Sequence, residues 1–369
     1  MVLRLAGILP MNILWLSWRD IKNPKSGGAE KVAFEVTKRL ARDKIEVIVF
    51  TSSFKNCLLR ENINGVTIIR KGSSLTCRLH AFAYYLANKD NFDLVVDEIN
   101  TLPFFAHLYA GKKSIAMIHQ IAHEYWFNQI SFPLSILGYI LEKPSLWLYR
   151  KVPTITVSNS SFKDLKRIGF KNVKIIREGL DFKPSLPTKK ENIILFLGRL
   201  TKAKGPQDAL AAFSQISKQL PQLRLLLIGR ADHKFLKILK QKSKDLQIQS
   251  KVSFEGFVSQ KTKINLLKKA KIVLIPSVRE GWNLVATEAG ATGCVPIAYN
   301  VPGLRDSIKN GQTGLLVEPK PAALANGTLK LLKNETSRSQ MAFAGYLWSK
   351  EFSWDNCYQD FKKIFLQFI

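Results

Sequence analysis

Residues 270–293 read AKIVLIPSVREGWNLVATEAGATG, a pattern that predicts a strand, a short loop and a helix. The apolar run from Ala270 to Pro276 is typical of a buried strand in a parallel sheet. Glu280 then lies just beyond the carboxyl end of that strand, and Glu288 lies two turns along the following helix. A helix N-terminus offers unpaired N–H groups and partial positive charge to a diphosphate, and carboxylates accept hydrogen bonds from sugar hydroxyls. The stretch therefore indicates a site for a nucleotide-linked sugar.

A cationic loop lies earlier in the same half of the chain. The predicted strand Asn192–Leu197 ends in the sequence GRLTKAKG, ahead of a predicted helix at Pro206–Leu220. Arg199 and Lys204 are thus expected at the carboxyl end of a strand beside a helix N-terminus. An Arg fork together with a Lys point charge suits the binding of a diphosphate.

The amino-terminal half repeats the alternation of strands and helices. A first strand is expected at Met11–Ser17, followed by the loop Ser26-Gly27-Gly28-Ala29-Glu30 and a helix. Gly27 and Gly28 suit a phosphate-approaching loop, although the loop matches neither G-x-G-x-x-G nor the Walker loop. His119 directly follows the predicted strand Ser114–Ile118, at the end of a parallel sheet where ligands bind. We expect His119 to be catalytic, the alternative being an ordinary polar loop residue.

Length and composition limit the architecture. A chain of 369 residues is too long for one ordinary core and favours two domains, with Asp181–Glu191 read as the linker. Because alternating strands and helices build parallel sheets, we predict an α/β fold in both halves. The four cysteines are scattered, which argues for a reducing compartment and against a thiolate metal site.

The net charge of +28 is compatible with nucleic acid, an anionic membrane or a phosphorylated substrate. A general coat of lysines on the helices explains it equally well. No helix-turn-helix, zinc-finger or RNP pattern occurs, so we expect no nucleic-acid partner.

The segment from Tyr125 to Lys151 leaves two alternatives open. Residues 125–141 carry no charge and are rich in aromatic and branched side chains, and cations follow at Arg150 and Lys151. Such a segment could lie in a membrane interface with its cations at the lipid phosphates. The alternative is a buried helical hairpin.

Taken together, these motifs resemble glycosyltransferase family 4, the large retaining family with the GT-B fold. The resemblance rests on Gly198-Arg199 with Lys204-Gly205, on Glu280 and Glu288 eight residues apart, on Pro302-Gly303, and on the segments around Gly27 and His119. It implies two Rossmann-like domains facing across a cleft: an acceptor domain at 1–182, a donor domain at 183–350, and a final helix at 351–369 that crosses back to the first domain.

The resemblance also implies roles for single residues. His119 and Glu280 would act in catalysis at the transferred sugar. The donor would be held at a second set of positions, namely Gly27, Gly28, Arg199, Lys204, Trp282, Asn283, Leu284 and Glu288. Many family members carry Phe-Gly where this chain has Trp282-Asn283, which leaves the identity of nucleotide and sugar open.

The expected reaction is the retaining transfer of a hexose from a UDP-, GDP- or ADP-sugar to a glycan or lipid-linked acceptor, in the cytoplasm or on the inner face of the membrane. No D-x-D motif occurs, and the cations can replace a divalent metal, so we expect neither metal nor cofactor. Two alternatives stay open: a sugar-nucleotide epimerase of the same fold, and a basic nucleic-acid-binding protein.

Overall fold

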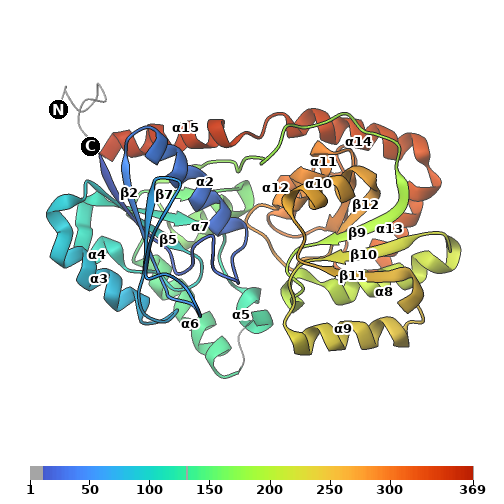
Figure 1. Ribbon diagram of the computed structural model, residues 1–369, viewed down its shortest axis with the longest axis horizontal. Helices are drawn as coiled ribbons and strands as arrows, with labels where there is room; N and C mark the ends of the chain where they lie inside the picture. The colour runs from blue at the N-terminus through green and yellow to red at the C-terminus, as the bar shows by residue number, and fades with distance from the viewer. Residues whose placement is uncertain (1–10, 130–131, 369) are drawn as a thin grey trace. The chain divides into compact units, whose positions relative to one another are not determined.

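The computed structural model describes residues 11–129 and 132–368, and the chain divides into two compact units (Figure 1). Unit 1 comprises the described residues up to His123, the segment Leu137–Gly179 and the residues from Ser353 onward. Unit 2 comprises Glu124–Ile136 and Leu180–Phe352. The division therefore falls close to the predicted borders after residues 182 and 350, but it assigns residues 124–136 to the second unit.

The sheet of unit 1 has eight strands within the described residues, in the order β3-β4-β2-β1-β5-β6-β7-β8. Its strands are β1 (Asn12–Leu16), β2 (Glu46–Thr51), β3 (Arg60–Ile63), β4 (Val66–Arg70), β5 (Leu94–Ile99), β6 (Ser114–Ile118), β7 (Thr154–Thr156) and β8 (Val173–Ile175). All neighbouring pairs are parallel except β3–β4.

The antiparallel edge was not predicted, although the rest of the sheet is parallel as expected. Strand β3 is short and polar, so its composition did not predict a strand. Asn64 and Gly65, between β3 and β4, both have positive φ, at 52° and 87°. An Asn-Gly pair joining two strands is typical of a tight hairpin, and this was the signal in the sequence.

Trp15 organises one face of this sheet. Side chains alternate along β1, so Leu14 and Leu16 pack with α3 (Cys77–Asn88) and α4 (Ala106–Ala110), and Trp15 points the other way. There the fully buried indole meets the rings of Phe361 and Phe365 at centroid distances of 6.2 and 6.4 Å. Both phenylalanines belong to α15 (Trp354–Phe365), near the opposite end of the chain.

Polar contacts join α15 to helix α2 (Gly28–Arg42) and its C-cap. Arg39 Nε lies 2.7 Å from Asp355 Oδ1, and Asp43 accepts hydrogen bonds from Tyr358 and Lys362. The predicted last segment, residues 351–369, thus contains a helix whose aromatic stripe completes the core of unit 1.

Replacing Phe361 with Ala should lower the stability of unit 1 by about 3–5 kcal/mol, because the buried ring leaves a cavity beside Trp15. In urea unfolding followed by fluorescence, unit 1 should then unfold at a lower urea concentration. Phe343→Ala is the matched control, since that ring on α14 (Glu335–Ser349) is half exposed; it should cost less than about 1 kcal/mol. Equal effects of the two substitutions would show that α15 does not stabilise unit 1 through this contact.

Unit 2 contains a six-stranded, wholly parallel sheet within the described residues, in the order β11-β10-β9-β12-β13-β14. Its strands are β9 (Glu191–Leu197), β10 (Arg224–Ile228), β11 (Val252–Gly256), β12 (Ala270–Ile275), β13 (Val295–Tyr299) and β14 (Leu315–Val317). The central strands are apolar on both faces, as expected for a sheet covered by helices on each side.

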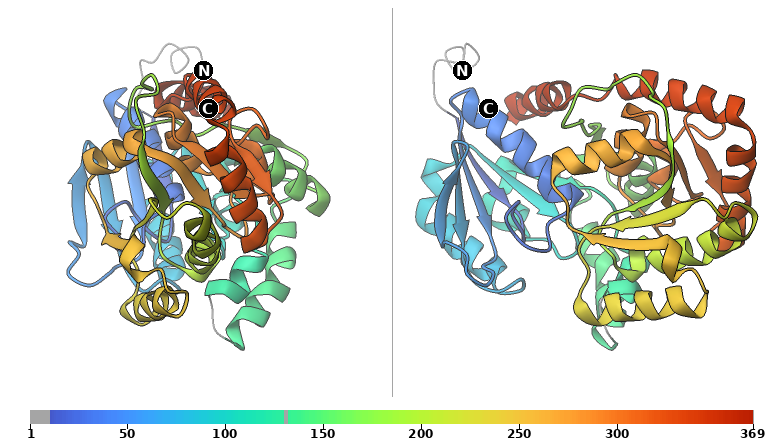
Figure 2. Two further views of the ribbon diagram at one scale, coloured as in Figure 1. Left: turned by 90° about the vertical axis from the view of Figure 1, so that its right-hand side faces the viewer. Right: turned by 45° about the vertical axis from the view of Figure 1, so that its right-hand side comes forward.

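Helices cover both faces of this sheet (Figure 2). Ile194 and Phe196 of β9 pack with α8 (Pro206–Gln219), α9 (His233–Asp245) and α13 (Pro321–Lys333). Leu195 points to the other face, toward α10 (Gln260–Lys269), α11 (Leu284–Ala291) and α12 (Leu304–Ser307). Helix α14 lies close to α11 at two glycines. A Cβ added to Gly290 would lie only 3.0 Å from the carbonyl oxygen of Gly345.

The segment that could have been a buried hairpin forms two helices with exposed apolar side chains. They are α5 (Glu124–Gln129), grouped with unit 2, and α6 (Leu134–Trp147), within which the division between the units falls. The hairpin interpretation is therefore wrong for the outward-facing residues, which include Phe127, Leu137 and Ile140. Among the described residues, no helix combines the length and apolarity that crossing a membrane requires.

Candidate functional site

The order of strands in unit 2 brings two loops together. Strand β9 lies at the centre, with β10 and β11 on one side and β12, β13 and β14 on the other. The connections from β9 and β12 therefore run toward opposite edges of the sheet. The gap between the two strands is a topological switch point, which is where open α/β sheets bind their ligands. Arg199 and Lys204 follow β9 and Glu280 follows β12, so the fold places their loops side by side.

Lys204 and Glu280 form a buried ion pair at this point. The Lys204 Nζ lies 2.6 Å from Oε1 and 2.7 Å from Oε2 of Glu280. The side chains are 20% and 8% exposed, respectively. Such a pair holds an ammonium and a carboxylate next to each other with little competing water.

Two glycines allow the loops to approach this closely. Gly205 has a φ of +71°, and a Cβ there would lie 2.2 Å from the carbonyl oxygen of Pro276. Gly303 has a φ of +79°, and a Cβ there would lie 2.1 Å from the carbonyl oxygen of Glu280. The Glu280 N–H also donates to the carbonyl oxygen of Pro302 at 3.1 Å. The Pro302-Gly303 turn therefore fixes the backbone of Glu280.

Charge is concentrated around Lys204. Burial acts to lower the pKa of Lys204, but the charge of Glu280 and its hydrogen bonds raise the pKa overall, so Lys204 stays protonated. Burial raises the pKa of Tyr125, whose phenol is hydrogen-bonded to Lys204. Arg199 acts electrostatically on both groups, yet within the described residues it has no ion-pair partner of its own. Arg199 is thus the cation available to an incoming anion.

Asn283 links Glu280 to helix α11. Its Nδ2 donates to Glu280 Oε1 at 3.1 Å, and its Oδ1 accepts from the N–H of Ala286 at 2.9 Å as the N-cap of the helix. The N–H of Leu284 belongs to the first turn of α11, where backbone donors have no intrahelical partner. Asn283 therefore orients the carboxylate and the helix N-terminus together.

Glu288 and Trp282 lie differently. Glu288, on α11, accepts from the Lys263 Nζ of α10 at 2.6 Å. The Trp282 indole packs against Trp348 and Phe352, with centroids 6.2 and 5.3 Å away, and its Nε1 donates to Thr287. The contacts of Trp282 are those of a core side chain, so only its backbone suits the predicted donor-binding role.

His119 of unit 1 lies between two carboxylates. It follows β6, with Nε2 3.4 Å from Glu98 Oε1 and Nδ1 3.6 Å from Glu178 Oε1. The Nε2 atom is buried and makes no hydrogen bond of good geometry among the described residues. Glu98 also accepts from the Trp15 Nε1 at 2.8 Å. Burial acts to lower the pKa of His119, but Glu178 and Glu98 raise it overall to about 9.

Gly27 and Gly28 begin helix α2. Gly27 is the N-cap residue, and its N–H donates to Glu30 Oε2 at 2.6 Å, while Glu30 Oε1 accepts from Arg19 Nε at 2.7 Å. The predicted glycine loop is therefore the N-terminus of a helix, anchored by a buried glutamate.

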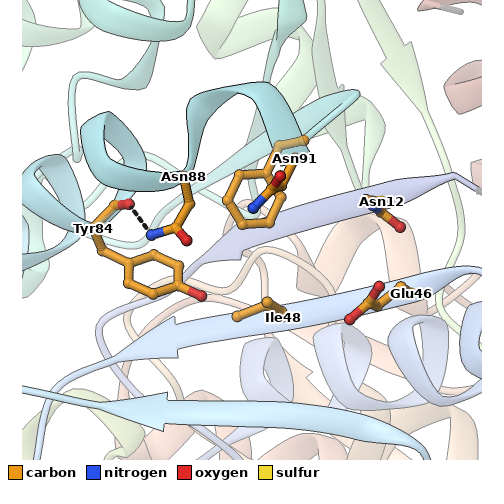
Figure 3. A pocket seen from close by; sticks show the side chains of 7 residues that line it. Asn12, Glu46, Ile48, Tyr84, Asn88 and Asn91 are labelled. Carbon is orange, nitrogen blue, oxygen red and sulfur yellow. Dashed lines mark hydrogen bonds between the residues drawn. The ribbon is translucent and has the colours of Figure 1, made fainter.

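A polar hollow of about 150 Å³ in unit 1 is not part of this arrangement (Figure 3). It lies where β1 and β2 begin, and Asn12, Glu46 and Tyr84 are among the residues that line it. Parallel sheets bind ligands at the opposite, carboxyl ends of their strands.

Two protein-family models match the chain. The model described as Glycosyltransferase Family 4 matches residues 26–183, and the model described as Glycosyl transferases group 1 matches residues 178–348. The chain belongs to the family 4 glycosyltransferases. The resemblance predicted from the sequence motifs is confirmed.

A curated relative is also named a glycosyltransferase. An uncharacterized glycosyltransferase of Methanocaldococcus jannaschii is 33% identical over 188 residues, which are 48% of this chain and 46% of that protein. The match thus spans less than half the length of this curated relative.

Two solved structures resemble the chain over almost its whole length. Sucrose-phosphate synthase from Thermosynechococcus elongatus superposes with a TM-score of 0.81 at 22% identity, covering 97% of this chain and 98% of that one. Anabaena HepE in complex with UDP-glucose gives 0.77 at 20% identity, covering 97% and 100%. These likenesses confirm the predicted GT-B fold class.

The predicted site residues are distributed over both units. In unit 2, Lys204, Glu280 and Asn283 are in direct contact, with Arg199 close enough to act on Lys204. His119, Gly27 and Gly28 belong to unit 1.

Four residues of interest were not singled out from the sequence: Glu98, Tyr125, Glu178 and Lys263. Only Glu98 carried a signal, as a charged residue inside the apolar strand β5.

The two carboxylates should hold His119 protonated well above neutral pH. We expect its imidazole to titrate near pH 9 in NMR spectra of the folded protein, against an ordinary value of 6.5. Because the folded-state pKa is the higher one, this interaction stabilises the fold fully below about pH 6.5 and is lost as the pH rises through about 9. Glu178→Gln should move the midpoint toward 6.5.

The control for this titration is Glu46→Gln, an exposed carboxylate of the same unit, which should leave the midpoint unchanged. Loss of the resonance in His119→Gln assigns it. A wild-type midpoint at or below 6.5 would contradict the proposed charge state.

Proposed function

We propose that this family 4 chain transfers a hexose from a nucleotide-diphosphate sugar to a glycan or lipid-linked acceptor, with retention of configuration and without a metal ion. The contact that supports this most directly is the Lys204–Glu280 ion pair, oriented by Asn283 and adjoined by Arg199. The four free cysteines suit a reducing compartment such as the cytoplasm.

The ion pair suits a ligand that carries a phosphate next to hydroxyl groups. Without ligand, Lys204 and Glu280 neutralise each other. A bound donor would offer its diphosphate to Lys204 and Arg199, and the hydroxyls of its sugar to the carboxylate of Glu280. Glu288 would bind the donor in a similar way. Ribose hydroxyls would replace the Lys263 ammonium, which now donates a hydrogen bond to this carboxylate.

The same cations would accelerate the reaction. Breaking the bond between sugar and phosphate places growing negative charge on the diphosphate, and groups that bind this charge more tightly in the transition state lower the barrier. Lys204, Arg199 and the N–H groups at the start of α11 are the described donors suited to that role.

His119 is better suited to donate a hydrogen bond than to remove a proton. Its raised pKa of about 9 keeps the imidazole protonated at neutral pH, and an imidazolium is not a general base. The proton of the acceptor hydroxyl would then pass to the departing phosphate, as in attack from the same face of the sugar. This assignment is consistent with retention.

The first donor to test is UDP-glucose, which the structurally similar HepE binds. A thermal-shift panel of UDP-, GDP- and ADP-glucose would identify the base, because a ligand that binds only the folded chain raises its melting temperature. The correct donor at about a hundredfold excess over its Kd should raise the melting temperature by about 5 °C or more. Absence of any shift across the panel would contradict donor binding.

Substituting the ion pair should remove transfer. We expect Lys204→Met and Glu280→Gln each to lower kcat/KM by about 100-fold or more, because each removes a group that acts on the leaving diphosphate or the sugar. Lys204→Met also leaves Glu280 buried without its partner, which costs about 3–5 kcal/mol. The double substitution should recover part of this stability but no activity.

Lys202→Met is the matched control, since Lys202 is exposed in the same 3-10 helix, Lys202–Lys204. It should keep near wild-type transfer. Full activity in Lys204→Met would overturn the assignment. Sugar products formed from donor alone, at the same rate with and without acceptor, would indicate an epimerase or hydrolase instead.

Transfer should persist in excess EDTA, because Arg199 and Lys204 supply the positive charge that a divalent ion would otherwise provide. Within the described residues, no group of three or more His, Cys, Asp or Glu side chains is placed to hold a metal ion. Initial rates measured with EDTA, and after adding Mg²⁺ or Mn²⁺, test this. Activity that disappears with EDTA and returns with either ion would refute metal independence.

A further inference from the structure

Helix α6 has the reverse of the usual amphipathic arrangement. Its inward stripe follows helical spacing through Ser135, Gly138, Glu142 and Leu146, so that small or polar residues make up its first half. The opposite side is apolar and exposed. It consists of Ile136, Leu137, Ile140, Leu141, Trp147 and, just beyond the helix, Leu148, each between 42% and 59% exposed. These six residues are termed the α6 face.

The charged groups near α6 also differ between its two sides, with the carboxylate buried and the cations on the outward side. Its one carboxylate, Glu142, is buried and accepts hydrogen bonds from the N–H groups of Ala122 and His123. Lys143 and Lys151 are exposed, and the Arg150 guanidinium lies 3.7 Å from the centroid of the Trp147 ring. The outward side is therefore both apolar and cationic, at the carboxyl end of the helix.

We propose that the α6 face binds the surface of an anionic phospholipid bilayer. A helix lying in the interface buries its apolar side among the acyl chains, while its cations remain at the lipid phosphates. Trp147 suits the boundary, because aromatic rings with a polar edge concentrate there. With 14 residues, α6 is shorter than the roughly 20 residues that spanning requires, so the expected mode is adsorption.

Charge favours a bilayer over a second copy of the chain. In a two-fold symmetric dimer the same patch meets itself, which would bring the cations around Lys143 and Lys151 against their counterparts. An anionic lipid surface complements those cations instead, and each Lys or Arg near it strengthens binding. The net charge of +28 adds a general attraction to the same surface.

The test uses the full chain and two kinds of vesicle, phosphatidylcholine alone and phosphatidylcholine mixed with phosphatidylglycerol, separated by flotation. Wild type should partition onto the mixed vesicles. Leu137→Glu combined with Ile140→Glu should reduce partitioning by at least about tenfold, because two apolar anchors are lost. Lys143→Gln combined with Lys151→Gln should reduce binding to the mixed vesicles by about tenfold and leave binding to phosphatidylcholine unchanged.

Leu58→Glu combined with Leu59→Glu is the matched control. These leucines are 64% and 67% exposed in unit 1, so the control adds the same two charges at another exposed apolar pair. It should change partitioning by less than about twofold. If the α6 variant is poorly folded by circular dichroism, Ile136→Glu combined with Leu141→Glu replaces it.

Three results would overturn the proposal. The first is partitioning of the α6 variants equal to wild type, and the second is no partitioning of wild type at all. The third is a wild-type dimer, seen by light scattering, that the α6 variants convert to monomer while vesicle binding stays unchanged. Donor binding is a separate readout: vesicle binding without any nucleotide-sugar thermal shift would reject the proposed function alone.

Discussion

The ion pair between Lys204 and Glu280 depends on a constraint of topology. Because strand order reverses at β9 and β12, the loops after these strands leave the sheet as neighbours. The glycines at 205 and 303 then let backbone approach backbone where a Cβ would collide with a carbonyl oxygen. Asn283 adds the third connection by binding Glu280 and capping α11 with the same amide. Sheet order, turn geometry and helix capping thus converge on one carboxylate.

The charged groups of unit 1 are arranged differently, with one imidazole and two carboxylates. One imidazole lies near two carboxylates, and one of those, Glu98, also accepts from the indole that anchors the core. The position of His119 is thereby tied to the packing of Trp15. In unit 1 a residue proposed to act on the sugar is thus connected to the hydrophobic core through Glu98.

Much of this fold was predictable because its signals are local. Buried parallel strands read as short apolar runs, and the ends predicted for β6, Ser114 and Ile118, coincide with the observed ones. The positions of Arg199, Lys204, Glu280 and Asn283 followed from strand ends. Contacts that arise only through tertiary packing could not be predicted. Nothing near Glu178 or Lys263 in the sequence indicates that these residues contact His119 and Glu288, respectively. The packing of the Trp282 indole was not predictable for the same reason, since its aromatic partners lie more than sixty residues away.

The position of α15 in the sequence affects the order in which the chain can fold. The indole of Trp15 leaves the ribosome long before Phe361 and Phe365, which pack against it, are made. All of unit 2 is synthesised in between. During translation the first sheet therefore carries an uncovered aromatic surface, which is the kind of surface that chaperones bind and that drives aggregation. Completion of unit 1 therefore waits for the synthesis of α15.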